Sequence, residues 1–283
     1  MSATIIDGRA LASTLRSRVV ERARVLRLKG VSPRLVVSFV GDDASSAAYV
    51  RSLVRAGEQA SVDVRVDSLD EGIAETALRE RLRLHAADPH VHGIVLAQPL
   101  PKRLAIERIG DAIPLEKDVD GTNPQTLGLL ALGSGGFTPA TPAAILRLLE
   151  TSPAVPLAGK RALVIGRSRV VGLPVALLLL ARNATVTIAH SKTADLARAV
   201  RDAEIVVAAA GVPSLVGAAM LAPGSVVIDA GTTVAGDKLV GDVDPDARSV
   251  AAALTPVPGG VGPVTNVVLM ENVVAAAERL SSG

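Results

Sequence analysis

Hydrophobic positions in the middle of the chain fall into short and long runs that are separated by glycine. Apolar residues fill 162–165, and a loop bounded by Gly166 and Gly172 follows them. A longer apolar segment then covers 173–181, and a β-branched run occupies 184–189. Short apolar runs of this kind are typical of buried strands, and the longer one is typical of a helix. The pattern predicts a strand–turn–helix–strand unit with two parallel strands.

The same alternation of strand-like and helix-like patterns runs through the whole chain. Residues 9–28 carry apolar side chains at helical spacing with arginines between them, which predicts an amphipathic helix. The Pro/Gly-rich stretch 255–263 is predicted to be a rigid loop. Together the elements predict a parallel α/β protein with a domain boundary near residue 140. The remaining predicted strands are 35–40, 62–66, 93–97, 205–209 and 226–230, and the remaining predicted helices are 46–60, 75–86, 138–149 and 265–280.

The loop between Gly166 and Gly172 has features of an anion-binding turn. Gly166 ends a strand, where a residue without Cβ allows a sharp turn and the close approach of a phosphate. Gly172 would open the helix, whose N-terminal N–H groups favour an anion, and Pro174 fits the first helical turn. The spacing differs from the dinucleotide fingerprint G-x-G-x-x-G. A glycine-flanked turn without a ligand therefore stays open as an alternative.

The end of the second strand of this unit favours NADP over NAD. A site for NAD usually has an acidic residue there, which binds the ribose 2′-hydroxyl. This chain has His190, Ser191 and Lys192 at that point, and the first carboxylate is that of Asp195. With Arg167 in the preceding loop, a guanidinium and a hydroxyl without an acid suit a 2′-phosphate.

Composition narrows the class of protein. The chain has 283 residues, of which 49% are hydrophobic, so two domains with sizeable cores are expected. A net charge of +2 and only 1% aromatic residues argue against nucleic-acid binding. The absence of cysteine excludes disulfides and thiolate metal sites.

Targeting and metal signals are lacking as well. No signal peptide is visible, and no apolar stretch reaches the roughly 20 residues of a membrane span, so a soluble cytoplasmic protein is expected. The histidines at 85, 90 and 92 are expected in solvent without a metal role.

Several blocks of the sequence together resemble one family. They read VGDD with Ser46 and Tyr-Val after it, KDVDG, GRSRVVGLP, HSKT and TPVPGGVGP, and they occur in the family's order over nearly the whole chain. The family is that of the bifunctional methylenetetrahydrofolate dehydrogenase/methenyltetrahydrofolate cyclohydrolase, FolD. The resemblance implies a folate domain over 1–140, a Rossmann NADP-binding domain over 141–264, a cleft between them, and a C-terminal helix over 265–283 packed on the first domain. It also implies a homodimer that acts on tetrahydrofolate derivatives.

The resemblance assigns roles to individual residues and no metal. Arg167 and Ser191 match the family's partners for the 2′-phosphate, and Thr141 matches a threonine near the nicotinamide. The implied cofactor-binding residues are Thr141, Gly166, Arg167, Ser168, Gly172, Ser191, Thr193, Gly211, Pro213 and Thr232. The implied substrate-binding residues are Ser46, Tyr49, Asp120, Gly262 and Pro263, with Tyr49, Asp120 and Gln98 as catalytic candidates.

The substrate half departs from the family pattern at two catalytic positions. The family has a lysine four residues after its tyrosine, and this chain has Leu53 there. The family's glutamine corresponds to Ala97, with Gln98 one residue later, and a shift of one in an extended segment turns the side chain to the opposite side. Thr122 and Asn123 also replace the usual Phe-His.

These departures affect the two reactions differently. Hydride transfer needs alignment of substrate and cofactor, whereas hydrolysis needs a proton carrier. The sequence therefore predicts an NADP-dependent methylenetetrahydrofolate dehydrogenase of one-carbon metabolism with doubtful cyclohydrolase activity. Two alternatives stay open: a fully bifunctional enzyme with a rearranged proton path, and an NADP-binding paralogue without folate turnover.

Overall fold

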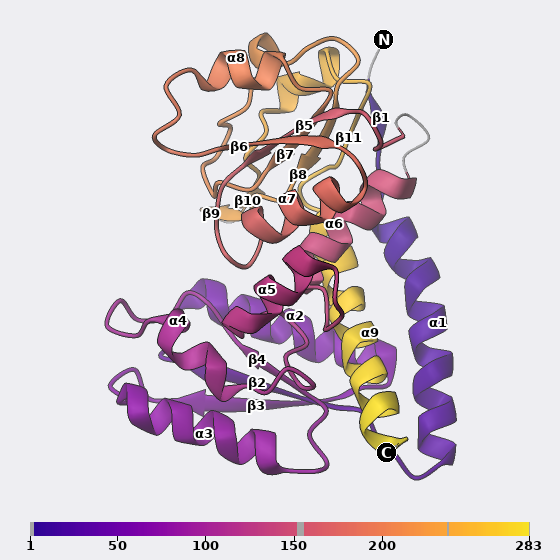
Figure 1. The fold of residues 1–283 in the computed structure, drawn as a ribbon, viewed down its shortest axis with the longest axis vertical. Coiled ribbons are helices and arrows are strands. Elements are labelled where there is room, and N and C mark those ends of the chain that lie inside the picture. Colours follow the sequence, from indigo (N-terminus) through magenta and orange to yellow (C-terminus); the bar gives the residue numbers. More distant parts are fainter. Residues whose placement is uncertain (1–2, 152–155, 237, 283) are drawn as a thin grey trace. The chain divides into compact units, whose positions relative to one another are not determined.

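The protein consists of two compact units, each built on a parallel sheet (Figure 1). The computed structural model describes residues 3–151, 156–236 and 238–282. One unit, called the cofactor unit below, comprises the residues up to Ala12 together with Thr141–Thr265. The other, called the substrate unit, comprises Ser13–Ala140 and the residues from Asn266 onward. The predicted α/β class with two domains is confirmed.

The start of the chain differs from the predicted division at 140. Strand β1 (Thr4–Ile5) pairs in parallel with β11 (Ala253–Leu254), so residues up to Ala12 belong to the cofactor unit. A two-residue strand is too short to show any alternation, which is why the pattern did not predict it. Helix α1 (Gly8–Leu28) begins directly after this strand.

The cofactor unit contains a six-stranded sheet in the order β1-β11-β8-β7-β5-β6. Every neighbouring pair is parallel, and Ile165 at the end of β5 is opposite both Ala189 of β6 and Ala208 of β7. The carboxyl ends of these strands therefore lie along one edge. The further strands are β5 (Arg161–Ile165), β6 (Thr185–Ala189), β7 (Ile205–Ala208) and β8 (Val226–Asp229), with a separate hairpin of β9 (Thr233–Ala235) and β10 (Lys238–Val240). The helices are α6 (Ala140–Thr151), α7 (Gly172–Ala181) and α8 (Leu196–Arg201).

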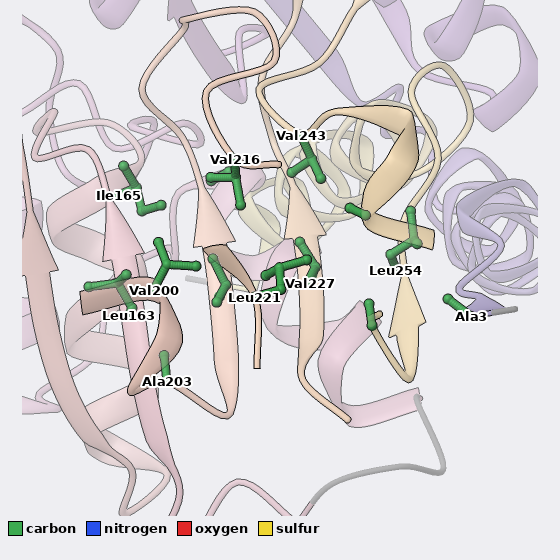
Figure 2. Packing of buried hydrophobic residues seen from close by; sticks show 14 of the residues in the cluster. Ala3, Leu163, Ile165, Val200, Ala203, Val216, Leu221, Val227, Val243 and Leu254 are labelled. Carbon is green, nitrogen blue, oxygen red and sulfur yellow. The ribbon is translucent and has the colours of Figure 1, made fainter. Parts of the chain in front are cut away.

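The core of this unit is aliphatic and covers one face of the sheet. Figure 2 shows Leu163, Ile165 and Val200 close to one another and Leu221 beside Val227. Burial of an aliphatic side chain of this size stabilises a fold by about 1.5–3 kcal/mol before the loss of conformational entropy is counted. The packed sheet gives the loops at its carboxyl edge a rigid base.

The substrate unit has a three-stranded parallel sheet in the order β3-β2-β4. Alternate residues of β2 point to opposite faces, and Val36 and Val40 pack with Leu78 and Leu82 of α3. A Cβ on Gly93 would lie 3.0 Å from Val273, so α9 packs against the sheet. The strands are β2 (Arg34–Val40), β3 (Asp63–Leu69) and β4 (Gly93–Leu96). The helices are α2 (Ala44–Ala60), α3 (Glu75–Ala87), α4 (Ile106–Ile109), α5 (Pro124–Leu132) and α9 (Val261–Ser281).

Helices α1 and α9 run side by side in the substrate unit (Figure 1). Arg22 of α1 donates to both carboxylate oxygens of Glu278, at 3.0 and 2.7 Å, and lies 3.6 Å from Glu271. A bidentate contact of this kind fixes the rotation of one helix against the other.

Three local predictions are corrected. Helix α9 begins at Val261 rather than 265, because Pro263 is tolerated in a first helical turn. Helix α5 was not predicted; it forms because the side chain of Asn123 caps its N-terminus and Pro124 follows. His92, predicted in solvent, is only 5% exposed, because its Nδ1 accepts from the amide of Arg34 at 3.2 Å beside β2.

None of the helices in the described ranges combines the length and the hydropathy that a bilayer-spanning helix requires. The cytoplasmic location stays a prediction.

Candidate active site

The loop after β5 makes the closest backbone approaches in the cofactor unit. Gly166 has a φ of +120°, and a Cβ there would lie 2.1 Å from the carbonyl oxygen of Ala209. A Cβ on Gly172 would lie 2.3 Å from the carbonyl oxygen of Gly166. Both positions therefore require glycine. The resulting narrow turn between a strand and a helix N-terminus suits a diphosphate group.

Ser168 organises this loop from within. Its Oγ accepts from the amides of Val171 and Gly172 at 3.1 and 3.2 Å, and its carbonyl oxygen accepts from Leu173. The first amides of α7 are thus bonded inside the loop. The helix dipole still favours an anion at this end, but direct contacts have to come from the loop residues that precede Val171.

The turn after β6 carries Ser191 at the same edge of the sheet as that loop. The amide of His190 donates to Thr193 Oγ1 at 2.9 Å, and the amide of Thr193 donates back to the carbonyl oxygen of His190 at 2.8 Å. Thr193 therefore closes the turn, and Ser191 at its tip is exposed. Because β5 and β6 are neighbours, Arg167 and Ser191 each lie two residues beyond adjacent strand ends. Both side chains are exposed at the same edge of the sheet, as a site for a 2′-phosphate requires.

A cavity of about 150 Å³ lies inside the cofactor unit at the same carboxyl edge. It brings together Thr232, predicted to bind the cofactor, and Gly262 and Pro263, predicted to bind the substrate. Arg9 and Asp229 also line it, and neither was a candidate from the sequence. Arg9 reaches the cavity because Gly8 packs directly on the loop, where a Cβ would lie 1.8 Å from the carbonyl oxygen of Gly260.

The other predicted cofactor residues of this unit lie in a loop and in a helix. Gly211 and Pro213 are exposed in the loop after β7. Thr141, in the first turn of α6, lies with its Oγ1 3.4 Å from the Oγ1 of Thr265 in α9.

In the substrate unit, helix α2 carries Ser46, Tyr49 and Leu53 at spacings of three and four. The Asp43 carboxylate accepts from the amide of Ser46 at 2.8 Å, which caps the helix. Ser46 is buried, and its Oγ has no hydrogen-bond partner among the described residues. Leu53 is fully buried at 0% exposure, whereas Tyr49 is partly exposed. Arg51 and Arg55 are exposed.

Two aspartates in the loop 117–121 have different environments. Burial and, to a smaller extent, the negative charge of Asp118 raise the pKa of Asp120 to about 7, and the amide of Ala140, which donates to Oδ1 at 3.4 Å, opposes the shift. Asp118 is fully buried and accepts from the amides of Thr122 and Asn123 at 2.8 and 3.0 Å, and from the Thr126 hydroxyl. Asp118 therefore fixes the loop, and Asp120 is its ionisable group near neutral pH.

Ala97, at the position of the family's glutamine, and Gln98, one residue later, differ in their exposure to solvent. Ala97 is 2% exposed, and its amide donates to the carbonyl oxygen of Ser38 at 2.9 Å, which extends the pairing of β4 with β2. Gln98 is exposed. The two side chains therefore lie in different surroundings. Thr122 and Asn123, which replace Phe-His, are both buried in the turn before α5. Asn123 donates to the carbonyl oxygen of Ile113 at 2.9 Å.

No group of three or more His, Asp or Glu side chains that could hold a metal ion occurs among the residues that the structure describes.

Comparison with known families covers both units. Residues 6–120 match the tetrahydrofolate dehydrogenase/cyclohydrolase catalytic domain, and residues 139–281 match the NAD(P)-binding domain of the same family. The chain belongs to the tetrahydrofolate dehydrogenase/cyclohydrolase family. The resemblance stated from the sequence motifs is thereby confirmed.

Individual relatives match over nearly their full length. The chain is 51% identical to the bifunctional protein FolD of Parafrankia sp. (strain EAN1pec), covering 96% of this chain and 98% of the relative. The structure of FolD from Trypanosoma brucei, complexed with NADP cofactor and inhibitor, has a TM-score of 0.95 at 37% identity and covers 100% of both chains. The bifunctional enzyme FolD from Campylobacter jejuni has a TM-score of 0.94 at 37% identity, covering 98% of this chain and 99% of that one.

Proposed function

We propose that this member of the family is an NADP-dependent methylenetetrahydrofolate dehydrogenase of one-carbon metabolism whose cyclohydrolase activity is weak or absent. The observation that carries the proposal is Leu53, a fully buried leucine one helical turn from Tyr49, at the position of the family's catalytic lysine. The cofactor unit carries Arg167 and Ser191, which match the family's partners for the 2′-phosphate, although Thr232 and Thr233 replace its usual Ile-Asn.

Dehydrogenation is compatible with the residues present. NADP supplies the chemistry by accepting a hydride from the methylene bridge of the folate. Arg167 and Ser191 bind the 2′-phosphate, and the glycines at 166 and 172 allow the backbone to approach the diphosphate. Tyr49 and Asp120 orient the pterin. Alignment of this kind requires no side chain to exchange a proton.

Cyclohydrolysis places a further demand on the chain. Water must add to the methenyl carbon and the ring must open, so protons have to move, and a positioned acid or base contributes about 100- to 10,000-fold. Leu53 has no proton to exchange, and Ala97 cannot replace the glutamine. Arg51 and Arg55 are unsuitable, because a guanidinium does not deprotonate in proteins.

One observation favours a second candidate, the fully bifunctional enzyme. Asp120, with a pKa of about 7, exchanges a proton near neutral pH and lies close enough to Tyr49 for its charge to affect the phenol. A proton path through Asp120 would replace the lysine without any cation.

The deciding experiment assays both half-reactions on one preparation, with a lysine-containing bifunctional relative as the positive control. We expect NADPH formation from methylenetetrahydrofolate at a rate similar to that of the relative, and hydrolysis of methenyltetrahydrofolate at least about 100-fold slower. Equal hydrolysis would establish the bifunctional alternative. NADP binding without NADPH formation would establish the paralogue without folate turnover.

A homodimer formed through the cofactor unit is part of the proposal. Strand β6 lies at the edge of the large sheet and presents Ile188 at 37% exposure, and Leu180 of α7 is 59% exposed. An edge strand with unpaired backbone groups and apolar neighbours is suited to pair with a second copy. Sedimentation equilibrium should give twice the chain mass, and Ile188→Asp should shift the protein towards the monomer.

A further inference from the structure

Two buried carboxylates lie at the carboxyl edge of the large sheet, where doubly wound folds bind dinucleotides. Asp229 ends β8 and is 4% exposed, and Asp242 follows the β9–β10 hairpin and is 0% exposed. Their hydrogen-bond partners among the described residues are backbone amides, and no cation contributes to the environment of Asp229. A buried carboxylate without a cation requires hydrogen-bond donors, and backbone amides supply them to both oxygens of Asp229 and to Oδ2 of Asp242. Oδ1 of Asp242 has no hydrogen-bond partner among the described residues.

Asp242 holds the loop that follows β7. Its Oδ2 accepts from the amides of Ala210 and Gly211 at 2.6 and 2.9 Å. Gly211 has a φ of +68°. One oxygen atom thus fixes the orientation of two successive peptides, in the loop that carries Gly211 and Pro213.

Asp229 in turn holds Asp242. Its Oδ1 accepts from the amides of Gly231 and Asp242, both at 2.9 Å, and its Oδ2 accepts from the amide of Val243 at 3.0 Å. Gly231 leaves no spare room, because a Cβ there would lie 2.2 Å from Asp242 Oδ1. Asp229 therefore holds the backbone of Asp242, and the Asp242 carboxylate has no room to move towards Gly231.

The loop that Asp242 holds is also a wall of the phosphate-binding turn. The carbonyl oxygen of Ala209, one residue before Ala210, lies 2.1 Å from where a Cβ of Gly166 would be. A displacement of the loop would therefore change the space beside Gly166.

We propose that Asp242 is a positioning residue for NADP. It acts through the backbone of Ala210 and Gly211, which it holds in the conformation that the dinucleotide needs, and it makes no contact with the cofactor itself. The inference rests on the proposed function of the cofactor unit as an NADP site. It follows that the oxygen acceptor at Oδ2 matters and the negative charge does not.

The test measures NADP⁺ binding to the purified full chain by calorimetry, with the KM for each substrate in parallel. Asp242→Ala should raise the Kd for NADP⁺ about 10- to 100-fold, because a displaced loop misplaces the cofactor. The KM for methylenetetrahydrofolate should rise less than the Kd for NADP⁺, because Asp242 bonds to the loop that carries the predicted cofactor residues Gly211 and Pro213. Asp242→Asn should stay within about threefold of the native Kd, because its amide oxygen can take the place of Oδ2. Gly231→Ala, which displaces the carboxylate without altering it, should reproduce the loss and decides the matter if Asp242→Ala does not fold.

The matched control is Asp246→Asn. Asp246 is exposed, and its carboxylate also accepts from a loop amide, that of Ala218 at 2.9 Å. Because that amide belongs to a different loop from Gly211, the Asp246→Asn variant should have the native Kd for NADP⁺. Native Kd values in folded Asp242→Ala and Gly231→Ala would overturn the inference, as would an Asn variant as weak as the Ala variant. If the native chain does not bind NADP⁺, the proposed function fails and the inference fails with it. If the native chain binds NADP⁺ and the Asp242→Ala and Gly231→Ala variants bind it equally well, the inference about Asp242 fails but the proposed function stands.

Discussion

The carboxylate of Asp120 lies close enough to the phenol of Tyr49 to raise its pKa. Burial raises the pKa of Tyr49 well above its usual value, and the negative charge of Asp120 raises it further. Tyr49 therefore remains a hydrogen-bond donor at neutral pH, while Asp120 is divided between its two protonation states. The substrate unit thus presents one fixed donor and one group that changes charge near pH 7.

The titration of Asp120 predicts a specific pH dependence of stability. Its pKa is about 7 in the folded protein and about 3.9 in the unfolded chain. The folded state binds the proton of Asp120 more tightly than the unfolded chain does. The stabilisation of the fold that results is fully present below about pH 4 and is lost as the pH rises through 7. Asp120→Asn, which stays neutral, should gain about 1–3 kcal/mol relative to the native protein between pH 5 and pH 8. Urea unfolding at both pH values measures the difference.

Asp111→Asn serves as the control, because the pKa of Asp111 is shifted in the opposite direction to that of Asp120. The hydrogen bond from Arg79 lowers the pKa of Asp111, so its contribution is present at pH 8 and is lost in acid. That variant should be equally or slightly less stable than the native protein at pH 8. An Asp120→Asn variant whose stability follows the native pH dependence would show that Asp120 titrates normally.

Arg167 is expected to determine the preference for NADP. Arg167→Ala should lower kcat/KM for NADP about 10- to 100-fold, because a hydrogen-bonded contact with a charged group contributes about 1.5–3 kcal/mol. The value for NAD, which lacks the 2′-phosphate, should change less than about threefold. The matched control is Arg169→Ala, which removes a positive charge from the same loop. It should leave the ratio of kcat/KM for NADP to kcat/KM for NAD unchanged. A native enzyme that prefers NAD would contradict the assignment.

Much of the fold could be predicted because its elements are long and periodic. Strand β5, which begins at Arg161, and helix α7, which begins at Gly172, differ from the predicted ranges by one residue at most. Short elements escaped prediction because their stability comes from partners distant in the sequence. Strand β1 depends on pairing with β11, and α5 depends on the cap from Asn123.

The candidate site shows the same limit. Motifs predicted Arg167 and Ser191 as cofactor residues, since each lies two residues beyond the end of a predicted strand. Asp242 gave no comparable signal, because its role depends on a hairpin that brings it to Gly211, 31 residues earlier in the chain. A lone aspartate after a glycine is also common in turns. The pKa of Asp120 could not be read from KDVDG, because it reflects burial by the folded unit.

Gly166 should tolerate no side chain. Gly166→Ala would place a Cβ 2.1 Å from the carbonyl oxygen of Ala209 at a φ of +120°, so the loop has to move. We expect NADP binding to weaken at least about 100-fold, as for a misplacement on the order of 1 Å. Gly159→Ala is the matched control: its φ is +77°, but no atom lies within 4 Å of the added Cβ. It should cost about 1 kcal/mol in stability and leave NADP binding intact.

Restoring the family's residues should restore hydrolysis. The double variant Leu53→Lys, Ala97→Gln should increase the hydrolysis of methenyltetrahydrofolate about 100-fold or more, because it supplies the missing proton carrier and its neighbour. It should also lose roughly 3 kcal/mol of stability, since both side chains enter positions that are at most 2% exposed.

The control for this variant is Leu53→Met, which keeps the volume and adds no amine. It should retain NADPH formation, cost less than about 1.5 kcal/mol in stability and show no gain in hydrolysis. A folded double variant that forms NADPH but hydrolyses no faster than the native chain would show that leucine is not what limits hydrolysis. The proton path would then have to be sought at Asp120, where Asp120→Asn should abolish whatever hydrolysis the native chain has.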